Sequence, residues 1–337
     1  MAENKKWKNF LLKSGLPLEY EIKKILEEKW VIWSDERSYL KADENKIINE
    51  FSIDIDASYL NKDYFFKLFI ECKYRDESTN WFFLPESYKW IDELDEWCFL
   101  HPCDHFNENA KFIFDGVISP LWKACWKGIE INSEGPNPKT ITQAINQLSY
   151  WLAEDIVSNF YHQLDSLFWM NREVIFCNIP IIITTANLYR IKSDIGIEEI
   201  KNTENILDIS TEEDCLVIKN KIWEDLKGHN NKIFKDFINK YGRDKLNSKL
   251  KSFNKDIDFV LEVIAEHCCP KWILVMNYSK NNKVFDKLFN LLDDISEPSP
   301  VLLDRIKERE EELITIKEEM KNICSQIKIP ILFVWKK

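Results

Sequence analysis

Glycine is scarce in this chain, which has only 7 among its 337 residues. Neither GxxxxGK(S/T) nor GxGxxG, the glycine-rich patterns that cradle nucleotide phosphates, occurs in it. Long hydrophobic runs are missing too, because stretches such as IPIII at 179–183 are far shorter than the ~20 residues that span a bilayer. These absences argue against a P-loop enzyme, a dinucleotide-binding enzyme and a membrane protein.

The N-terminal residues, MAENKKWKNFLLKSG, have no apolar core and no small-residue cleavage site. We therefore expect no signal peptide and a cytoplasmic location, in which the 9 cysteines are reduced thiols. Four residues of zinc-ligand type, Cys98, His101, Cys103 and His105, lie within a single short segment. Structural zinc sites usually use two ligand pairs separated by a longer loop, so we interpret these four as loop and core residues.

The chain is rich in apolar residues (45%) and aromatic residues (13%), enough for one large domain or two modest ones. Its net charge of −11 is unfavourable for binding nucleic acid, but residues 219–255 carry eleven basic and four acidic residues, a local +7. This basic stretch fits a phosphate contact or a solvated helix face, and the sequence leaves both open. The candidate phosphate-binding residues are Lys232, Lys235, Lys240, Arg243, Lys245, Lys249 and Lys251.

Two neighbouring segments, SIDIDASY (52–59) and KLFIECKYR (67–75), alternate apolar and polar residues as half-buried strands do. Residues 61–63 (NKD) have the composition of a tight turn between them. Alternation sends Glu71 and Lys73 to the same face of their strand. If the two strands pair, an aspartate of the first joins them.

Two carboxylates beside one ammonium group suggest a divalent metal site. Asp54 and Glu71 are the paired candidate ligands, and the backbone carbonyl of Cys72 could complete the shell with Mg²⁺ or Mn²⁺. Asp56 is an alternative ligand, because alternation turns it the same way as Asp54. Lys73 would orient or deprotonate a water and offset charge at a phosphate, which is the chemistry of phosphodiester hydrolysis.

SIDIDA, the 16-residue spacer after Asp54 and the IECK segment together resemble the PD-(D/E)XK nuclease superfamily, with an Ile-Asp-Ile-x-Ala pattern similar to that of Mrr-like members. The leading proline is absent, since Ile53 precedes Asp54, and the Q-x-x-x-Y motif of RecB-like members is not met. The resemblance implies an α/β restriction-endonuclease-like core, a central mixed sheet flanked by helices. Its order of helix, three antiparallel strands, helix and strand fits residues 17–186.

The resemblance also implies two helpers at the metal site. A glutamate on the first helix matches Glu19, with Glu21 as the weaker match, and a glutamine on the helix after the E-x-K triplet matches Gln147 or Gln143. We expect a nuclease-like domain over 1–200 and an α/β C-terminal extension over 201–337, which contains the basic stretch.

The periodicity predicts further elements along the chain. Expected helices cover 18–30, 140–157, 258–267, 286–292 and about 306–327, and expected strands cover 126–131, 173–192, 215–220, 272–278 and 329–335. Residues 133–138 (SEGPNP) have the composition of a loop.

The function expected from these patterns is Mg²⁺-dependent cleavage of DNA, in restriction or anti-phage defence by family analogy. Two alternatives remain: a nuclease that acts on RNA or on branched or damaged DNA, and a non-catalytic nuclease-like scaffold. Nucleic acid is the expected partner, no membrane is expected, and a protein partner or a homo-oligomer is left open.

Overall fold

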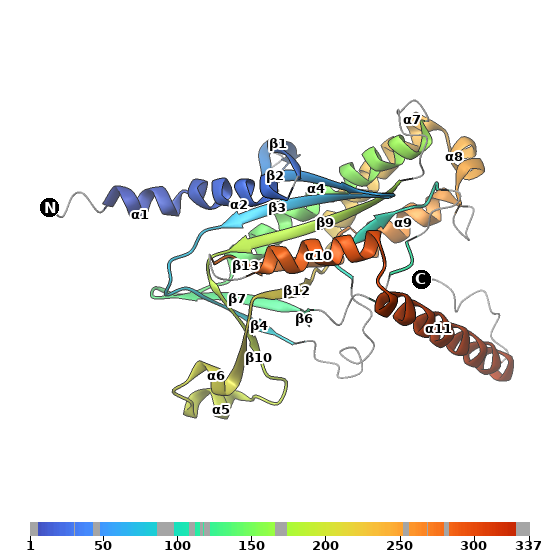
Figure 1. Ribbon diagram of the computed structural model, residues 1–337. Helices are drawn as coiled ribbons and strands as arrows, with labels where there is room; N and C mark the ends of the chain where they lie inside the picture. The colour runs from blue at the N-terminus through green and yellow to red at the C-terminus, as the bar shows by residue number, and fades with distance from the viewer. Residues whose placement is uncertain are drawn as a thin grey trace.

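The computed structural model describes residues 6–29, 31–42, 48–85, 98–107, 112–114, 117, 122–165, 174–251, 256–267, 269–279 and 283–327 (Figure 1). The strand predicted at 329–335 and much of the segment 86–122 lie outside these residues. The fold is α/β, with two mixed sheets and flanking helices.

Within the described residues, the larger sheet has eight strands. Seven follow one another in the order β1 (Ile32–Ala42), β2 (Ile48–Asn61), β3 (Tyr64–Lys73), β9 (Ile175–Thr184), β13 (Trp272–Asn277), β12 (Cys215–Lys219) and β6 (Lys123–Cys125), and β5 (His101–Cys103) pairs with β9. Strands β1, β2 and β3 are antiparallel, whereas β3 and β9 are parallel. The turn predicted at 61–63 is confirmed: β2 and β3 join there, and Lys62 has a positive φ of 51°.

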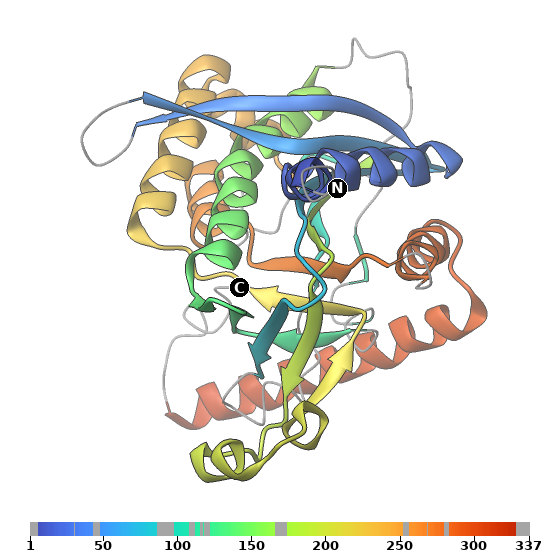
Figure 2. The same cartoon turned by 90° about the vertical axis from the view of Figure 1, so that its left-hand side faces the viewer.

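The smaller sheet contains β11 (Ser210–Glu213), β10 (Asn187–Ile191), β4 (Asn80–Leu84), β7 (Lys127–Asn132) and β8 (Gly135–Asn137), in that order. In the described part of the chain the helices are α1 (Lys6–Lys13), α2 (Leu16–Glu28), α4 (Lys139–Leu164), α5 (Ile197–Asn202), α6 (Ile206–Ile209), α7 (Glu224–Tyr241), α8 (Arg243–Lys249), α9 (Ile257–His267), α10 (Val284–Ser296) and α11 (Pro300–Ile327). Figures 1 and 2 both place α5 and α6 beyond the far end of the smaller sheet.

Two layers of helices cover the larger sheet because its central strands are apolar on both faces. Alternate residues of β9 and β13 enter two separate core clusters, one shared with α2 and α10 and the other with α4, α7, α8 and α9. In β3 the residues Phe66, Leu68, Ile70 and Cys72 enter the α2 cluster. The polar residues of β3 that alternate with them therefore face α4.

The predicted order of helix, three antiparallel strands, helix and strand is observed as α2, β1, β2, β3, α4 and β9, with further short strands inserted before α4. Strands β12 and β13 come from the C-terminal part of the chain, yet they extend the sheet beyond β9. The two regions expected at 1–200 and 201–337 thus share one sheet and both core clusters.

The single strand predicted over 173–192 is wrong, because the chain leaves the larger sheet after Thr184 and enters the smaller one as β10. The Thr184 hydroxyl donates to the Lys73 carbonyl (2.9 Å) and accepts from the Ala186 N–H (3.1 Å), which stabilises the change of direction. The loop expected at 133–138 also contains a short strand, β8, which forms a hairpin with β7.

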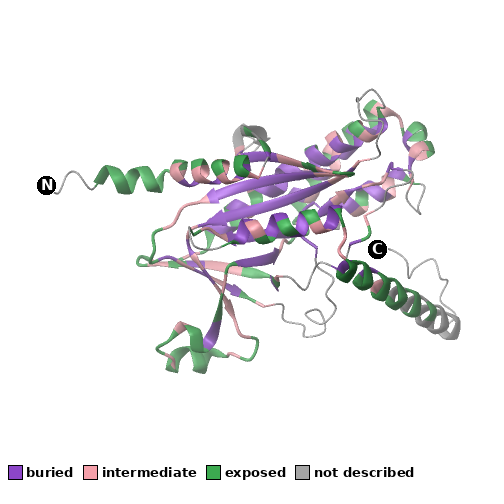
Figure 3. Ribbon diagram, viewed as in Figure 1, coloured by how far each residue is buried: buried purple, intermediate pink, exposed green. Residues whose placement is uncertain are grey.

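Exposure is uneven over the molecule (Figure 3). The central strands are buried, whereas none of the residues of α1 is, and α1 extends away from the body. Among the described residues, none of the helices is both long enough and apolar enough to cross a membrane.

Candidate functional site

The middle of β2 and the end of β3 bring Asp54 and Cys72 into contact. The Asp54 Oδ2 atom accepts the backbone N–H of Cys72 at 2.7 Å. Ile53 and Ile55 on either side of Asp54 pack into different core clusters, so β2 changes the facing of its side chains at this point. Alternation alone therefore does not set the direction of Asp54, and its carboxylate lies across the end of β3.

Glu71 is almost fully buried, with 1% of its surface exposed. Its Oε1 atom forms an ion pair with the Lys73 ammonium, whereas its Oε2 atom is buried without a hydrogen-bond partner. Burial raises the pKa of Glu71 to about 7, the charges of Asp54 and Glu19 act in the same direction, and Lys73 opposes them. A buried carboxylate with an unsatisfied oxygen is costly and is a ready ligand for a cation.

Lys73 and α4 meet through Gln147. The Lys73 ammonium donates to the Gln147 side-chain oxygen at 3.3 Å, and the Gln147 amide donates to the Ser52 carbonyl at 3.4 Å. Gln147 thus holds Lys73 between α4 and the start of the SIDIDA segment. The alternative glutamine, Gln143, is exposed on α4.

The two glutamates of α2 have different surroundings. The charge of Glu19 raises the pKa of Glu71, and it also raises the pKa of the Cys72 thiol, to which burial contributes most. Glu19 therefore lies beside the carboxylate cluster, which consists of Asp54, Glu71 and Lys73. Glu21 instead accepts the Tyr278 hydroxyl at 2.8 Å. Of the two glutamates, Glu19 therefore acts electrostatically on the candidate site.

Asp56 is buried, with 5% of its surface exposed, and lies opposite Phe69 in the β2–β3 register. It is thus further from the end of β3 than Asp54, which is the carboxylate that contacts Cys72. The geometry favours Asp54 over Asp56 as the partner of Glu71.

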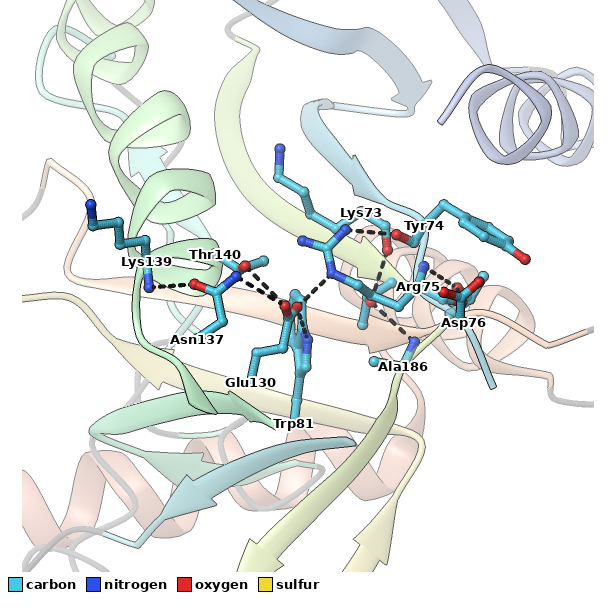
Figure 4. Close-up of polar contacts among 12 residues, drawn as sticks. Lys73, Tyr74, Arg75, Asp76, Trp81, Glu130, Asn137, Lys139, Thr140 and Ala186 are labelled. Carbon is cyan, nitrogen blue, oxygen red and sulfur yellow. Dashed lines mark hydrogen bonds and ion pairs between the residues drawn. The ribbon is translucent and has the colours of Figure 1, made fainter. Parts of the chain in front are cut away.

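A polar network that the sequence analysis missed adjoins this cluster (Figure 4). Arg75 forms an ion pair with the buried carboxylate of Glu130 on β7, and Glu130 also accepts from the indole of Trp81 (3.0 Å) and from the hydroxyl of Thr140 (3.2 Å). The network ties the end of β3 to the smaller sheet and to the first turn of α4. The position of Arg75, two residues beyond Lys73, was the one sequence feature that pointed to a role at the site. Its partner Glu130 could not be found in this way, because it is 55 residues away in the chain.

The end of the basic stretch, on α7 and α8, lies far from the carboxylate cluster. The Lys249 ammonium donates to the carbonyl of Leu164 at the end of α4 (3.0 Å), and Lys240 lies over the ring of Tyr161. Leu164 is 17 residues after Gln147, which corresponds to about 26 Å along the helix axis.

A divalent cation fits the donors of the cluster. Within the described ranges, no three His, Cys, Asp or Glu side chains form a ready-made metal cage. Mg²⁺, however, commonly uses only one or two carboxylates and completes its shell with water and substrate phosphates. Asp54 and the unsatisfied Oε2 of Glu71 meet that requirement, and Lys73 balances part of their charge.

Among the described residues, the other cysteines and histidines give no comparable site. Cys98 and Cys103 pack into different core clusters, and a ring nitrogen of His101 contacts the carbonyl of Trp272 at 2.8 Å. Burial lowers the pKa of His101 to about 4, as expected for a neutral core histidine.

No protein-family model, curated protein or solved structure matches this chain. The candidate site therefore rests on the residues and their geometry.

Proposed function

We propose that this protein is a divalent-metal-dependent nuclease with a restriction-endonuclease-like, PD-(D/E)XK core, and that it hydrolyses phosphodiester bonds in DNA. The observation that carries the proposal is the buried Oε2 atom of Glu71, which has no hydrogen-bond partner. The charge of Asp54 raises the pKa of the same carboxyl group, so the two carboxylates lie near each other. A purely structural Glu71–Lys73 pair would satisfy both oxygens, because an unpaired buried acceptor costs about 1–3 kcal/mol.

In this mechanism, Asp54 and Glu71 hold the ion, with the Cys72 backbone carbonyl as the third expected ligand. A bound Mg²⁺ or Mn²⁺ supplies charge stabilisation at the phosphate and lowers the pKa of a bound water. Hydrolysis adds the water oxygen to phosphorus, breaks the bond to the leaving oxygen and delivers a proton to that oxygen. Lys73, held by Gln147, orients the water and offsets charge on the non-bridging phosphate oxygens.

The order of elements supports the same assignment. The pair of strands that carries Asp54 and Glu71 is flanked by α2, which brings Glu19, and by α4, which brings Gln147. These are the two helper positions that the family resemblance implies. The negative net charge of the chain means that DNA must be drawn by the metal ion and by local basic surfaces.

The test is nicking of supercoiled plasmid with Mg²⁺, with Mn²⁺ and with chelator. Lys73→Ala is expected to abolish nicking while Mg²⁺ still raises the melting temperature, since both carboxylates remain. Lys127→Ala, a change at an exposed lysine on β7, is the matched control and should nick like the unaltered chain. Nicking retained by a clean Lys73→Ala preparation would overturn the assignment.

A further inference from the structure

A cavity of about 370 Å³ lies away from the carboxylate cluster. It is lined by Trp126, Lys219, Asn220, Lys221, Ile222, Glu266 and Lys271. Its volume is at the lower end of the range for small-molecule pockets, which suits a single nucleotide unit and excludes a duplex.

The lining is basic and aromatic. Lys219, Lys221 and Lys271 provide three ammonium groups, and the one carboxylate, Glu266, forms an ion pair with Lys227 on α7. The positive charge therefore gathers on the side formed by the β12–α7 loop and the start of β13. Phosphate groups are the ligands that such clusters of lysines favour.

Two tryptophans accompany these lysines. Trp126 lines the cavity and has 46% of its surface exposed, so its ring is accessible to a ligand. Trp223 is 63% exposed, and the Lys221 ammonium lies 4.0 Å from its ring centroid. Exposed rings interleaved with lysines are the combination that binds single-stranded nucleic acid, by stacking on bases and by contact with phosphates.

The cavity is linked to the candidate catalytic cluster through α4. Asn220 donates to the Ser149 hydroxyl at 3.1 Å, and Gln147, two residues earlier on α4, accepts from Lys73. A separation of two residues corresponds to about 3 Å along the helix axis and about 200° around it. The cavity and the carboxylate cluster therefore lie on opposite sides of α4 at nearly the same level, separated by the helix diameter of about 10–12 Å.

The surface of α4 between the two sites is polar and exposed. At 3.6 residues per turn, the arc between Gln147 and Ser149 carries the exposed residues of the first half of the helix. These are Lys139, Thr142, Gln143 and Asn146. A strand that crosses this arc meets hydrogen-bonding groups and no apolar barrier.

We propose that this cavity binds one nucleotide of a single-stranded segment of nucleic acid, with its base on Trp126 and its phosphate on Lys219, Lys221 and Lys271. The choice of a nucleic-acid strand as ligand rests on the proposed nuclease function. The nucleotide in the cavity belongs to the same strand as the bond that is cut, or to the displaced strand opposite it. The protein thereby selects substrates with a single-stranded region next to the cleavage position.

The test is equilibrium binding of a fluorescein-labelled, 20-nucleotide oligo-dT, measured by fluorescence anisotropy. A metal chelator is present so that no cleavage occurs. Trp126→Ala should weaken binding about 5- to 150-fold through lost stacking, whereas Trp126→Phe should keep most of the affinity. The double change Lys221→Ala, Lys271→Ala should make the negative slope of log binding constant against log salt concentration shallower by about 1.4. The double change Lys201→Ala, Lys307→Ala removes the same charge at exposed lysines of α5 and α11 and should leave affinity unchanged.

The outcomes separate the two proposals. If the cavity variants lose oligo-dT binding, the cavity proposal is supported. If, in addition, the unaltered chain cleaves no substrate, the nuclease assignment is overturned. Unaltered oligo-dT affinity in the pocket variants overturns the pocket alone, whether or not the chain cleaves DNA. Competition by poly-glutamate at equal charge, or saturation by a free mononucleotide with no binding of oligo-dT, would also overturn it.

Discussion

Replacing Glu71 by glutamine should change how the stability of the protein depends on pH, because Glu71 is a buried carboxyl group with a raised pKa. Its pKa is about 7 in the folded chain, against an ordinary value of 4.5. Between these two values the folded state keeps a proton that the unfolded chain has released. Stability should therefore fall as pH rises from about 4.5 to about 7 and level off above that.

The size of the effect follows from the shift in pKa. At 1.36 kcal/mol per unit, the full contribution of Glu71 is about 3 kcal/mol, and solvent screening reduces it little because the side chain is almost fully buried. Glu71→Gln stays neutral at every pH. In chelator it should be more stable than the unaltered chain by about 1 kcal/mol at pH 5, and the difference should rise to about 3 kcal/mol at pH 8.

The assay is denaturant unfolding at several pH values between 5 and 8, in chelator and again with Mg²⁺. If the proposed site binds the ion through the ionised carboxylate, Mg²⁺ should stabilise the unaltered chain above pH 7 and stabilise Glu71→Gln far less. Glu77→Gln, at an exposed glutamate beyond the end of β3, is the control and should follow the unaltered chain. Parallel stability curves for Glu71→Gln and the unaltered chain in chelator would refute the reasoning.

Two further changes test the surroundings of the site. Asp155→Ala leaves the buried ammonium of Lys67 without its ion partner and should lower the free energy of unfolding by about 3–5 kcal/mol. The double change Lys67→Met, Asp155→Leu should recover much of this loss. A loss below about 1 kcal/mol for Asp155→Ala would contradict the buried-pair argument. Removing the charges of Lys240 and Lys245, which lie over the rings of Tyr161 and Tyr241, should lower the salt slope of duplex DNA binding by about 1.8. An unchanged slope would identify the basic stretch as solvated surface.

The central features were predictable from sequence because they depend on local patterns. Asp54 and Glu71 lie on strands joined by a tight turn, so the turn and the alternation of residues together limit the register. The helices at 140–157 and 258–267 follow from their periodicity, and α4 and α9 confirm them. The facing of Asp54 did not follow, because β2 departs from simple alternation there.

Contacts between distant segments could not be predicted in the same way. The Arg75–Glu130 pair joins residues 55 positions apart, and the Asn220–Ser149 bond joins residues 71 apart. Neither periodicity nor composition encodes such pairs, since they depend on how elements that are distant in the chain pack together. The continuation of the sheet through β13 and β12 was missed for the same reason, because a buried strand reveals its apolar character but not its neighbours.

The shared sheet has a consequence for how the candidate site is held. Glu71 and Lys73 lie at the end of β3, which pairs along its whole length with β9, and β9 pairs with β13 from the C-terminal part. The cost of burying an ionisable carboxyl group must be met by the packing around it, and here that packing comes from both halves of the sequence. Truncation after residue 200 would remove β12, β13, α7 and α9, and with them part of both core clusters. The candidate metal-binding residues would then lose the rigid support that keeps Glu71 out of water, although none of them lies in the removed part.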